Sequence, residues 1–303
     1  MEFSFTVLGS SAAIPALGRN LSAHIVQHDS NVFLIDCGDG TQLQLDKHKI
    51  KKQKINQIFI SHLHGDHVYG LFGLLTSYSL FGRVNELEIF APAGLKEMID
   101  IVFEKSFAFL TYPIKVHLLP TEGFNLIFEN NKLSVFSFPL KHRVACNGFL
   151  FREKEKPANI NPDKIKKYNL DYESIKAIKS GSDYITADGI CIPNSEMVFP
   201  KQPLRSFAYC CDTAYNLEMV PYLENCDLIF HDATFDKSNQ ENATLTLHST
   251  SEEAAQIALS ANAKKLLLGH FSSRNKSLEV LLQEAKSIFD ASFLAEEGKK
   301  VVL

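Results

Sequence analysis

The stretch His62-Leu63-His64-Gly65-Asp66-His67 decides how this 303-residue chain folds and which chemistry it supports. It places three imidazoles and one carboxylate in six positions, directly after the strand-like run 58–61. Imidazole and carboxylate are the groups that hold Zn²⁺ and similar divalent ions at hydrolytic centres. Because side chains two positions apart share a face of an extended segment, we expect His62 and His64 to converge on one ion. A tight turn then brings Asp66 and His67 towards a second ion.

Composition narrows the class of protein. Hydrophobic residues make up 45% of the chain, which is enough for a sizeable core. The net charge of -4 gives no overall sign of a nucleic-acid binder, although a local basic face would suffice. Residues 1–8 lack the features of a signal peptide, and no run approaches the roughly 20 apolar residues of a membrane span. Six cysteines without paired spacing favour a reduced protein, so we expect a cytoplasmic location and no membrane contact.

Strand-like and helix-like runs alternate along the chain. β-Branched or aromatic runs predict strands at residues 3–8, 32–36, 55–61, 87–91, 116–119, 133–138, 206–210, 227–230, 265–268 and 301–303. Apolar residues at helical spacing predict helices at residues 68–81, 95–103, 214–223, 250–260 and 277–288. This mixed order favours a single α/β domain over residues 1–303, with sheets covered by helices.

One polar segment, residues 152–181, interrupts this pattern. It holds eight Lys or Arg residues against five Asp or Glu, a balance of +3 within a chain of net charge -4. Asn161-Pro162-Asp163 predicts the start of a short helix that ends at Tyr168, and a second helix is expected at 172–178. We interpret the segment as an excursion inserted into the domain. On composition alone, a solvated loop with surface helices is an equal alternative.

Three further candidate ligands each follow a predicted strand. His142 comes after the run 133–140, Asp212 after 207–211 and His270 after 266–269. In α/β folds the carboxyl ends of strands gather the chemistry at one edge. A lone residue at such a place is more commonly a cap or a turn residue, but the three together complete a site for two metals. We expect one ion to be held by His62, His64 and His142, the other by Asp66, His67 and His270, and Asp212 to bridge them.

Several ordered motifs connect this chain with a known family. They are His62-Leu-His-Gly-Asp-His-Val-Tyr-Gly-Leu-Phe-Gly-Leu-Leu75, Ile14-Pro-Ala-Leu-Gly-Arg-Asn20, Asp36-Cys-Gly-Asp-Gly-Thr-Gln42, His231-Asp-Ala-Thr-Phe235, His248-Ser-Thr250 and Gly269-His-Phe-Ser-Ser-Arg274. Together they resemble the metallo-β-lactamase superfamily and, within it, the ribonuclease Z family of tRNA 3′-processing endonucleases. The resemblance runs through nearly the whole chain. It departs from the family at Asp232, where the family has Glu.

The resemblance implies a fold and a reaction. The fold would be the metallo-β-lactamase αββα sandwich with an inserted flexible arm, and the cofactor two Zn²⁺ per chain, with Mn²⁺ equally suited to nitrogen and oxygen ligands. The reaction would remove the 3′ trailer from precursor tRNA and leave a 3′-hydroxyl on the tRNA. Asp66 would accept the proton of the attacking water, and His248, working with Asp232, would protonate the leaving oxygen. Because Asp is one methylene shorter than Glu, we expect the contact to His248 to require a small shift or to weaken.

The resemblance also assigns substrate contacts and partners. Arg19, Asn20 and Arg274 flank the predicted site and would contact the substrate, with ordinary salt bridges as a nearly equal alternative for the two arginines. The excursion 152–181 occupies the place of the arm with which the family grips tRNA, and it lacks the Gly-Pro pair that the family usually carries near the tip of the arm. A homodimer is implied by the resemblance alone.

Two alternative functions stay open at this stage. One is a hydrolase of the same fold that acts on a small phosphodiester or thioester, which predicts no functional arm. The other is an RNA-binding homologue that has lost catalysis, which predicts broken metal ligands. The presence of segment 152–181 and of all seven candidate ligands favours the endonuclease over both.

Overall fold

The part of the chain described by the computed structural model, residues 2–200 and 203–303, forms two seven-stranded sheets and one two-stranded sheet. The first sheet has the order β16 (Lys300–Val302), β1 (Phe3–Gly9), β2 (Ala23–His28), β3 (Asn31–Cys37), β4 (Ile55–Phe59), β5 (Leu87–Ala91) and β6 (Ile114–Leu118). The second has the order β15 (Ser292–Leu294), β14 (Leu266–Gly269), β13 (Leu228–Asp232), β12 (Ser206–Cys210), β9 (Asn147–Glu153), β8 (Leu133–Pro139) and β7 (Asn125–Glu129).

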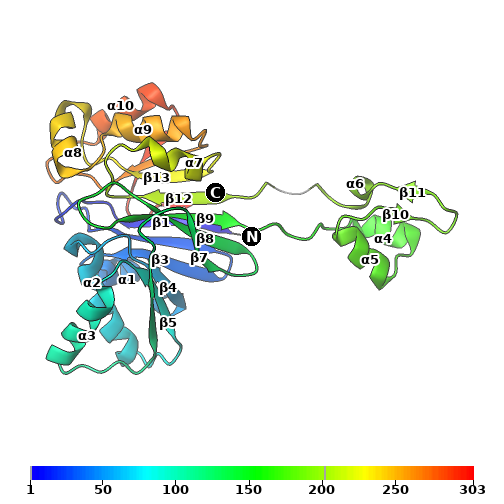
Figure 1. Ribbon diagram of the computed structural model, residues 1–303, viewed down its shortest axis with the longest axis horizontal. Helices are drawn as coiled ribbons and strands as arrows, with labels where there is room; N and C mark the ends of the chain where they lie inside the picture. The colour runs from blue at the N-terminus through cyan, green and yellow to red at the C-terminus, as the bar shows by residue number, and fades with distance from the viewer. Residues whose placement is uncertain (1, 201–202) are drawn as a thin grey trace. The chain divides into compact units, whose positions relative to one another are not determined.

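The outer faces of both sheets are covered by helices, as Figure 1 shows. On the first sheet lie α1 (Thr41–Lys47), α2 (Gly65–Leu80) and α3 (Leu95–Lys105). On the second lie α9 (Ser251–Ser260) and α10 (Glu279–Ile288), with α8 (Gln240–Thr246) nearby. The expected αββα layering is therefore confirmed. Within the described residues, every helix falls short of the length and apolarity that a bilayer span requires.

Parallel pairing sets the position of the site. Strands β3 to β6 pair in parallel in the first sheet, and β12 to β15 pair in parallel in the second. The carboxyl ends of parallel neighbours meet at one edge, where loops collect functional side chains. The loops after β3, β4, β12, β13 and β14 therefore all belong to the rim on which the candidate ligands lie.

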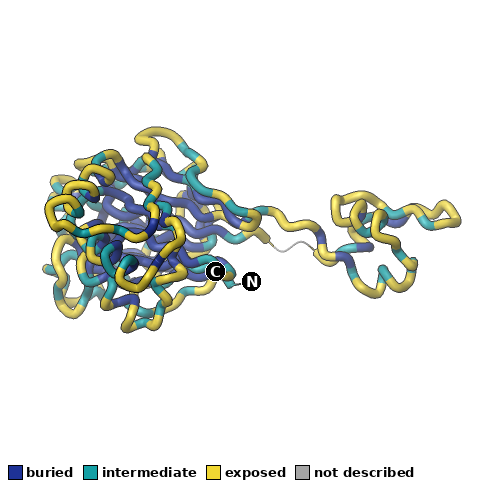
Figure 2. The backbone as a smooth tube through the Cα atoms, turned by 90° about the horizontal axis from the view of Figure 1, so that it is seen from below, coloured by how far each residue is buried: buried dark blue, intermediate teal, exposed yellow. Residues whose placement is uncertain are grey.

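Aromatic side chains fill the space between the two sheets. The rings of Phe5 in β1 and Phe207 in β12 stack with their centroids 4.3 Å apart, and both side chains are fully buried. Phe59 contacts Phe149 and Phe151 of the facing sheet. In Figure 2 the buried backbone, in dark blue, runs through the interior of the region that contains the two seven-stranded sheets. Because each large aromatic ring buries on the order of 150–250 Å², this layer fixes the sheets against each other.

Residues 153–204 form a compact unit of their own, which we call the insert, and the described residues 2–152 and 205–303 form the main unit. It contains α4 (Pro162–Tyr168), α5 (Tyr172–Lys179), β10 (Tyr184–Ile185), β11 (Cys191–Ile192) and α6 (Asn194–Met197). The side chain of Asn161 caps α4 and that of Asp171 caps α5, as their residue types favour. Both helices lie where the sequence predicts them.

The insert differs in extent from the predicted excursion 152–181. Its buried core joins Ile160 and Ile178 to Ile192 and Met197, so the segment after residue 181 is required to cover the two helices. The complete insert contains eight lysines and eight acidic residues, and its net charge is therefore zero. The excess of +3 belongs only to the shorter segment.

Other element predictions were wrong for identifiable reasons. The helix predicted at 214–223 is a 3₁₀ turn at Leu217–Met219 followed by the four-residue α7 (Val220–Leu223), because Pro221 has no amide hydrogen to continue an earlier helix. Strand β2 was missed because it is buried on both faces and two of its buried positions carry the polar side chains of His24 and His28. Both histidines are fully buried, and His24 packs between the rings of Phe5 and Phe230.

Candidate active site

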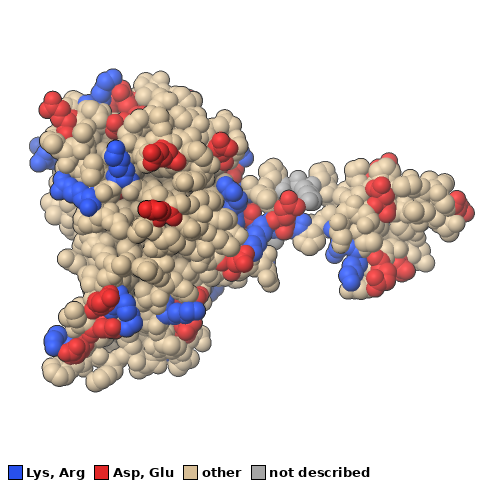
Figure 3. Space-filling model, in the orientation of Figure 1, with Lys and Arg blue, Asp and Glu red and all other residues tan. Residues whose placement is uncertain are grey.

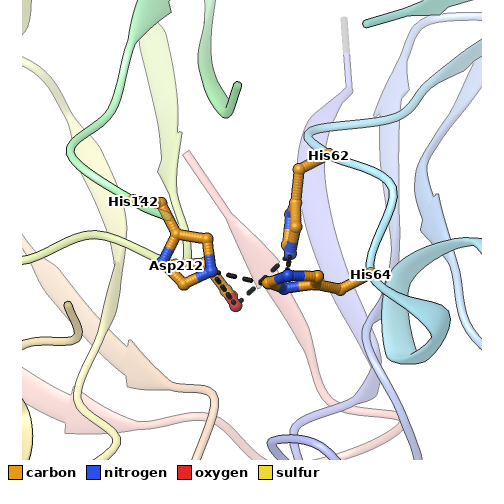
Figure 4. Close-up of side chains that lie close together, drawn as sticks. All are labelled: His62, His64, His142 and Asp212. Carbon is orange, nitrogen blue, oxygen red and sulfur yellow. Dashed lines mark hydrogen bonds and ion pairs between the residues drawn. The ribbon is translucent and has the colours of Figure 1, made fainter. Parts of the chain in front are cut away.

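Four predicted ligands converge into a first cluster (Figure 4). His62 Nε2 lies 3.0 Å from His64 Nδ1, and His142 Nε2 lies 3.3 Å from the same His64 nitrogen. Asp212 Oδ2 lies 3.5 Å from His62 Nε2 and 3.8 Å from His142 Nε2. The first two histidines follow β4 in the first sheet, whereas His142 and Asp212 follow β8 and β12 in the second. The cluster therefore joins the two sheets.

A second cluster lies beside the first and shares Asp212 with it. His67 Nε2 is 3.4 Å from His270 Nε2, and the two nitrogens are 3.2 Å and 3.1 Å from Asp212 Oδ1. Asp66 Oδ2 is 3.5 Å from His67 Nε2 and 3.6 Å from His270 Nε2. The two carboxylate oxygens of Asp212 thus face different clusters, which is the arrangement of a bridging ligand.

The donor sets of both clusters fit a divalent metal. Ligands bound about 2.0–2.2 Å from a tetrahedral Zn²⁺ lie about 3.3–3.6 Å from one another. The distances between donor atoms in each cluster, 3.0 to 3.8 Å, span that range. Two ring nitrogens this close repel each other when neither carries a hydrogen, because both then present lone pairs. A cation between them removes this repulsion.

The backbone contributes to this convergence. Asp212 and His270 have φ angles of 60° and 58°, in the left-handed region that residues other than glycine rarely adopt. Each follows a buried strand, and the left-handed conformation turns the chain sharply at that point. Strain of this kind, roughly 1–3 kcal/mol for each residue, persists only where the surroundings hold it in place, and it is common at functional sites.

Groups behind the first cluster orient its imidazoles. Ser61 Oγ lies 3.0 Å from His62 Nδ1, and His142 Nδ1 donates to the carbonyl oxygen of Leu247 across 3.2 Å. Such partners fix the tautomer and the ring orientation of a metal-binding histidine. Burial lowers the pKa of both His62 and His142, so both rings are neutral, as metal binding requires.

Asp36 orients His67, and its role was not assigned from the sequence. Its buried carboxylate accepts hydrogen bonds from His67 Nδ1 at 2.8 Å, from the Tyr209 hydroxyl at 2.8 Å and from the Ser61 amide at 2.8 Å. The sequence feature that could have identified Asp36 is its position at the end of a strand, as the first residue of the motif 36–42. Burial alone would lower the pKa of His67, but Asp212 and Asp36 raise it well above its ordinary value. The same negative field favours a divalent cation.

His248 and Asp232 form a hydrogen-bonded pair next to the clusters. Asp232 Oδ2 is 2.7 Å from His248 Nδ1, so the shorter Asp side chain makes the contact at full strength. The amide of Thr213 and the hydroxyl of Thr234 also donate to this carboxylate. Burial opposes the charged form of His248, but Asp232 outweighs it and raises the pKa of His248 to about 9. His248 therefore carries a proton at neutral pH, with Nε2 available as a donor.

The three predicted substrate contacts occupy different environments. Arg19 donates from one guanidinium nitrogen to the carbonyl oxygens of Ser272 at 3.0 Å and Asn275 at 3.3 Å. The side chain of Asn20 donates to Glu297 at 2.6 Å. Both side chains are thus engaged within the chain. Arg274 is exposed, and its guanidinium has no hydrogen bond or ion pair with any part of the chain that the structure describes.

Comparison with known proteins identifies the family. The chain is 39% identical over 302 residues to ribonuclease Z of Bacteroides thetaiotaomicron, an alignment that spans 100% of this chain and 96% of the relative. Among solved structures, it resembles the short form of human tRNase Z with a TM-score of 0.70 and 26% identity, covering 98% of each chain. The metallo-β-lactamase fold protein YhfI of Bacillus subtilis, 20% identical with a TM-score of 0.70 and 99% of each chain covered, shares the fold.

A family model described as anti-Pycsar protein Apyc1 also matches residues 3–107, about a third of the chain. This match covers the strands and helices that carry the opening histidine motif and none of the insert. The full-length match is the decisive one, because it includes the predicted ligands from both sheets. The fold is that of the metallo-β-lactamase proteins, and the chain belongs to the ribonuclease Z family.

Proposed function

We propose that this protein is a metal-dependent endonuclease that removes the 3′ trailer of precursor tRNA and leaves a 3′-hydroxyl on the tRNA. The observation that carries the proposal is the bridging position of Asp212 between two clusters of metal-binding side chains. Membership of the ribonuclease Z family supports the choice of substrate. Two Zn²⁺ are the proposed cofactors, and Mn²⁺ would suit the same nitrogen and oxygen donors.

The ligands divide between two ions. His62, His64 and His142 would hold one ion, Asp66, His67 and His270 the other, and Asp212 both. When bound, the two cations would neutralise charge on the phosphoryl oxygens and activate a water molecule. Asp66 would accept the proton of that water. Burial opposes its ionisation, but His270 and His67 lower the pKa of Asp66, so its carboxylate is ionised at neutral pH.

The pair of His248 and Asp232 would complete the reaction. Water attacks phosphorus, the bond from phosphorus to the 3′-oxygen of the tRNA breaks, and the phosphate stays on the trailer. His248 Nε2 would give its proton to the departing 3′-oxygen. Asp232 would hold the ring through Nδ1 and stabilise its charged form. Water would lose one proton to Asp66 and the tRNA would gain one from His248, so the protons balance.

The insert is the proposed grip on the tRNA. Its net charge of zero argues against general attraction of phosphate, so any contact must be local. Five lysines, at positions 164, 166, 167, 176 and 179, lie on α4 and α5. Both signs of charge are visible on the insert in Figure 3. We propose that these helices carry the phosphate contacts, with Arg274 as a further contact on the main unit.

Two further proposals rest on the family and on the thiols. The five buried cysteines and the exposed Cys191 are all free, which fits a reducing compartment, so we propose a cytoplasmic location. A homodimer is proposed from family resemblance alone. Sedimentation of the purified protein at several concentrations tests it.

The proposed activity is tested on two substrates in parallel. Purified protein is incubated with a trailer-bearing precursor tRNA and with a small chromogenic phosphodiester, each with and without a chelator. We expect cleavage at the trailer junction that the chelator abolishes and added Zn²⁺ or Mn²⁺ restores. The H62A variant should lose activity on both substrates. The matched control is H117A, since His117 of β6 pairs with Glu88 of β5 and belongs to neither cluster.

The outcomes separate the alternatives. Hydrolysis of the small ester without cleavage of the precursor would establish a small-phosphodiester hydrolase. Binding of the precursor with no hydrolysis of either substrate, in protein loaded with metal, would establish a catalytically silent RNA-binding homologue.

A further inference from the structure

We propose that Glu297 is a positioning residue for the reaction. It would hold the loop 10–20 (the N-terminal loop) in the conformation that hydrogen-bonds the carboxylate of Asp66. The inference rests on the proposed role of Asp66 at the metal centre. It concerns a residue that lies 231 positions away from Asp66 in the sequence and outside every motif that identified the family.

Glu297 collects four hydrogen bonds from the two ends of the N-terminal loop. Its Oε1 accepts from the Ser10 amide at 3.1 Å, the Ser10 hydroxyl at 3.3 Å and the Asn20 amide at 2.7 Å. Its Oε2 accepts from Asn20 Nδ2 at 2.6 Å. One carboxylate therefore closes the base of the loop. Hydrogen bonds to an ionised acceptor are about twice as strong as neutral ones.

The N-terminal loop contacts the metal centre through Ala13. The Ala13 amide donates to Asp66 Oδ2 across 2.8 Å, to the same oxygen that faces His67 and His270. Ala13 has a φ of 60°, which an alanine does not adopt without support from its surroundings. Its side chain is exposed, so packing of Ala13 itself does not supply that support. The support must come from the parts of the loop that are fastened.

A second set of bonds fastens the same loop next to His270. The Ala12 amide donates to the carbonyl oxygen of Phe271, and the Phe271 amide donates to that of Ser10. Arg19 reaches the carbonyl oxygens of Ser272 and Asn275. The loop is thus bonded to Asp66 on one side and to Phe271, the residue after His270, on the other. At the base of the loop Glu297 is a charged acceptor, and without it these four donors lose their partner.

The consequence for the reaction follows from the geometry at Asp66. A carboxylate that binds a cation and accepts a proton must present its oxygens at fixed positions, and the Ala13 amide holds one of them. Loss of a group that orients a ligand typically lowers activity by roughly 10–100-fold. Because the loop acts on Asp66 and not on the RNA, the loss should fall on the rate of the chemical step for any phosphodiester.

The test compares E297A, E297Q and E296A. Glu296 is the matched control, since it is the adjacent acidic residue, is exposed and forms an ion pair with the surface residue Lys299. For each variant, the single-turnover rate constant and the KM are measured on precursor tRNA and on the chromogenic phosphodiester. Zinc content per chain and the midpoint of thermal unfolding are measured on the same preparations.

We expect E297A to lose 10-fold or more in rate constant on both substrates, by the same factor, with KM and zinc content within twofold of the wild type. E297Q keeps the Oε1 acceptor and should retain at least a third of the rate. E296A should match the wild type. If E297A is unfolded at the assay temperature, N20A carries the test, because it removes only the 2.6 Å bond. It should lower both rates about threefold or more.

Three results would overturn the proposal. A raised KM for precursor with an unchanged rate on the small ester would make the loop an RNA contact. Equal losses in E297Q and E297A would assign the effect to charge. Unchanged rates in a destabilised E297A would leave Glu297 with a purely structural role. If the wild type hydrolyses only the small ester, the proposed tRNA activity fails, and the same comparison on that ester still decides the role of Glu297.

Discussion

Asp232 Oδ2 lies 2.7 Å from His248 Nδ1, and the carboxylate is completely buried while the imidazole is 15% exposed. The pair therefore holds a charged imidazole beside the two clusters, with its ring 5.2 Å from those of His142 and His270. We predict that D232A lowers the single-turnover rate on precursor tRNA by roughly 10–100-fold without changing metal content. Rapid-quench kinetics together with metal analysis of the same sample measure both quantities. Turnover equal to that of the wild type would remove Asp232 from the mechanism.

The pH dependence of the reaction should report on His248. Its folded pKa is raised to about 9 from an ordinary 6.5, so the protonated form persists at neutral pH and is lost as pH rises through about 9. A general acid acts only while protonated, so the single-turnover rate should fall above pH 9 by about tenfold per pH unit. In D232N the negative charge that raises the pKa of His248 is absent, so the fall in rate should begin at a lower pH. A fall that begins at the same pH would assign the acid to another group.

Asp36 should control the affinity of the second cluster for its metal ion. Its carboxylate orients His67 by accepting a hydrogen bond from it. The variant D36N would place an amide group, itself a donor, where the carboxylate now accepts hydrogen bonds. Asn tolerates the left-handed φ of 55° at this position, so the backbone should be preserved. We predict a loss of roughly 10–100-fold in affinity for the ion held by His67. Titration against a chromophoric chelator measures it.

The control for this prediction is Y209F. It removes one hydrogen bond from the same carboxylate and keeps the charge and the bond to His67. Its metal affinity should stay within a few-fold of the wild type. If both variants bind metal equally well, Asp36 has no part in holding the second ion.

Removal of the insert should separate substrate binding from chemistry. A variant in which a short Gly/Ser linker replaces residues 153–204 should hydrolyse the small phosphodiester at the wild-type rate, because every candidate ligand lies in the main unit. Its KM for precursor tRNA should rise strongly. A cut at residue 181 would be a poor design, since it divides the cluster of Ile160, Ile178, Ile192 and Met197. Loss of both activities would show that the insert supports the main fold.

The candidate metal centre could be predicted from the sequence because its proposed ligands are chemically distinctive and follow strands. His62, His142 and Asp212 each come soon after a buried run, and parallel strands bring such ends to one edge. All seven predicted ligands converge in the structure. The short contact between Asp232 and His248 depends on local backbone positions, whereas residue type alone predicted either a small shift or a weaker contact.

The remaining parts of the site depend on contacts that sequence spacing does not encode. Arg19 and Asn20 carry the groups expected of substrate contacts, yet the structure turns both towards the chain itself. Glu297 follows a short strand in a charged segment and has no distinguishing neighbours. The end of the insert was misplaced for a similar reason, because β10 and β11 have two residues each and are recognisable only by the core that they cover.

The sharing of ligands between the sheets has a thermodynamic consequence. Each cluster takes two ligands from the first sheet and two, Asp212 included, from the second, so a bound ion is a cross-link through the middle of the sandwich. An ion present at 100 times its dissociation constant would add about 2.7 kcal/mol to the free energy of unfolding, provided that the unfolded chain does not bind it. The concentration of available metal in the cell would therefore control the stability of the folded protein as well as its catalytic rate.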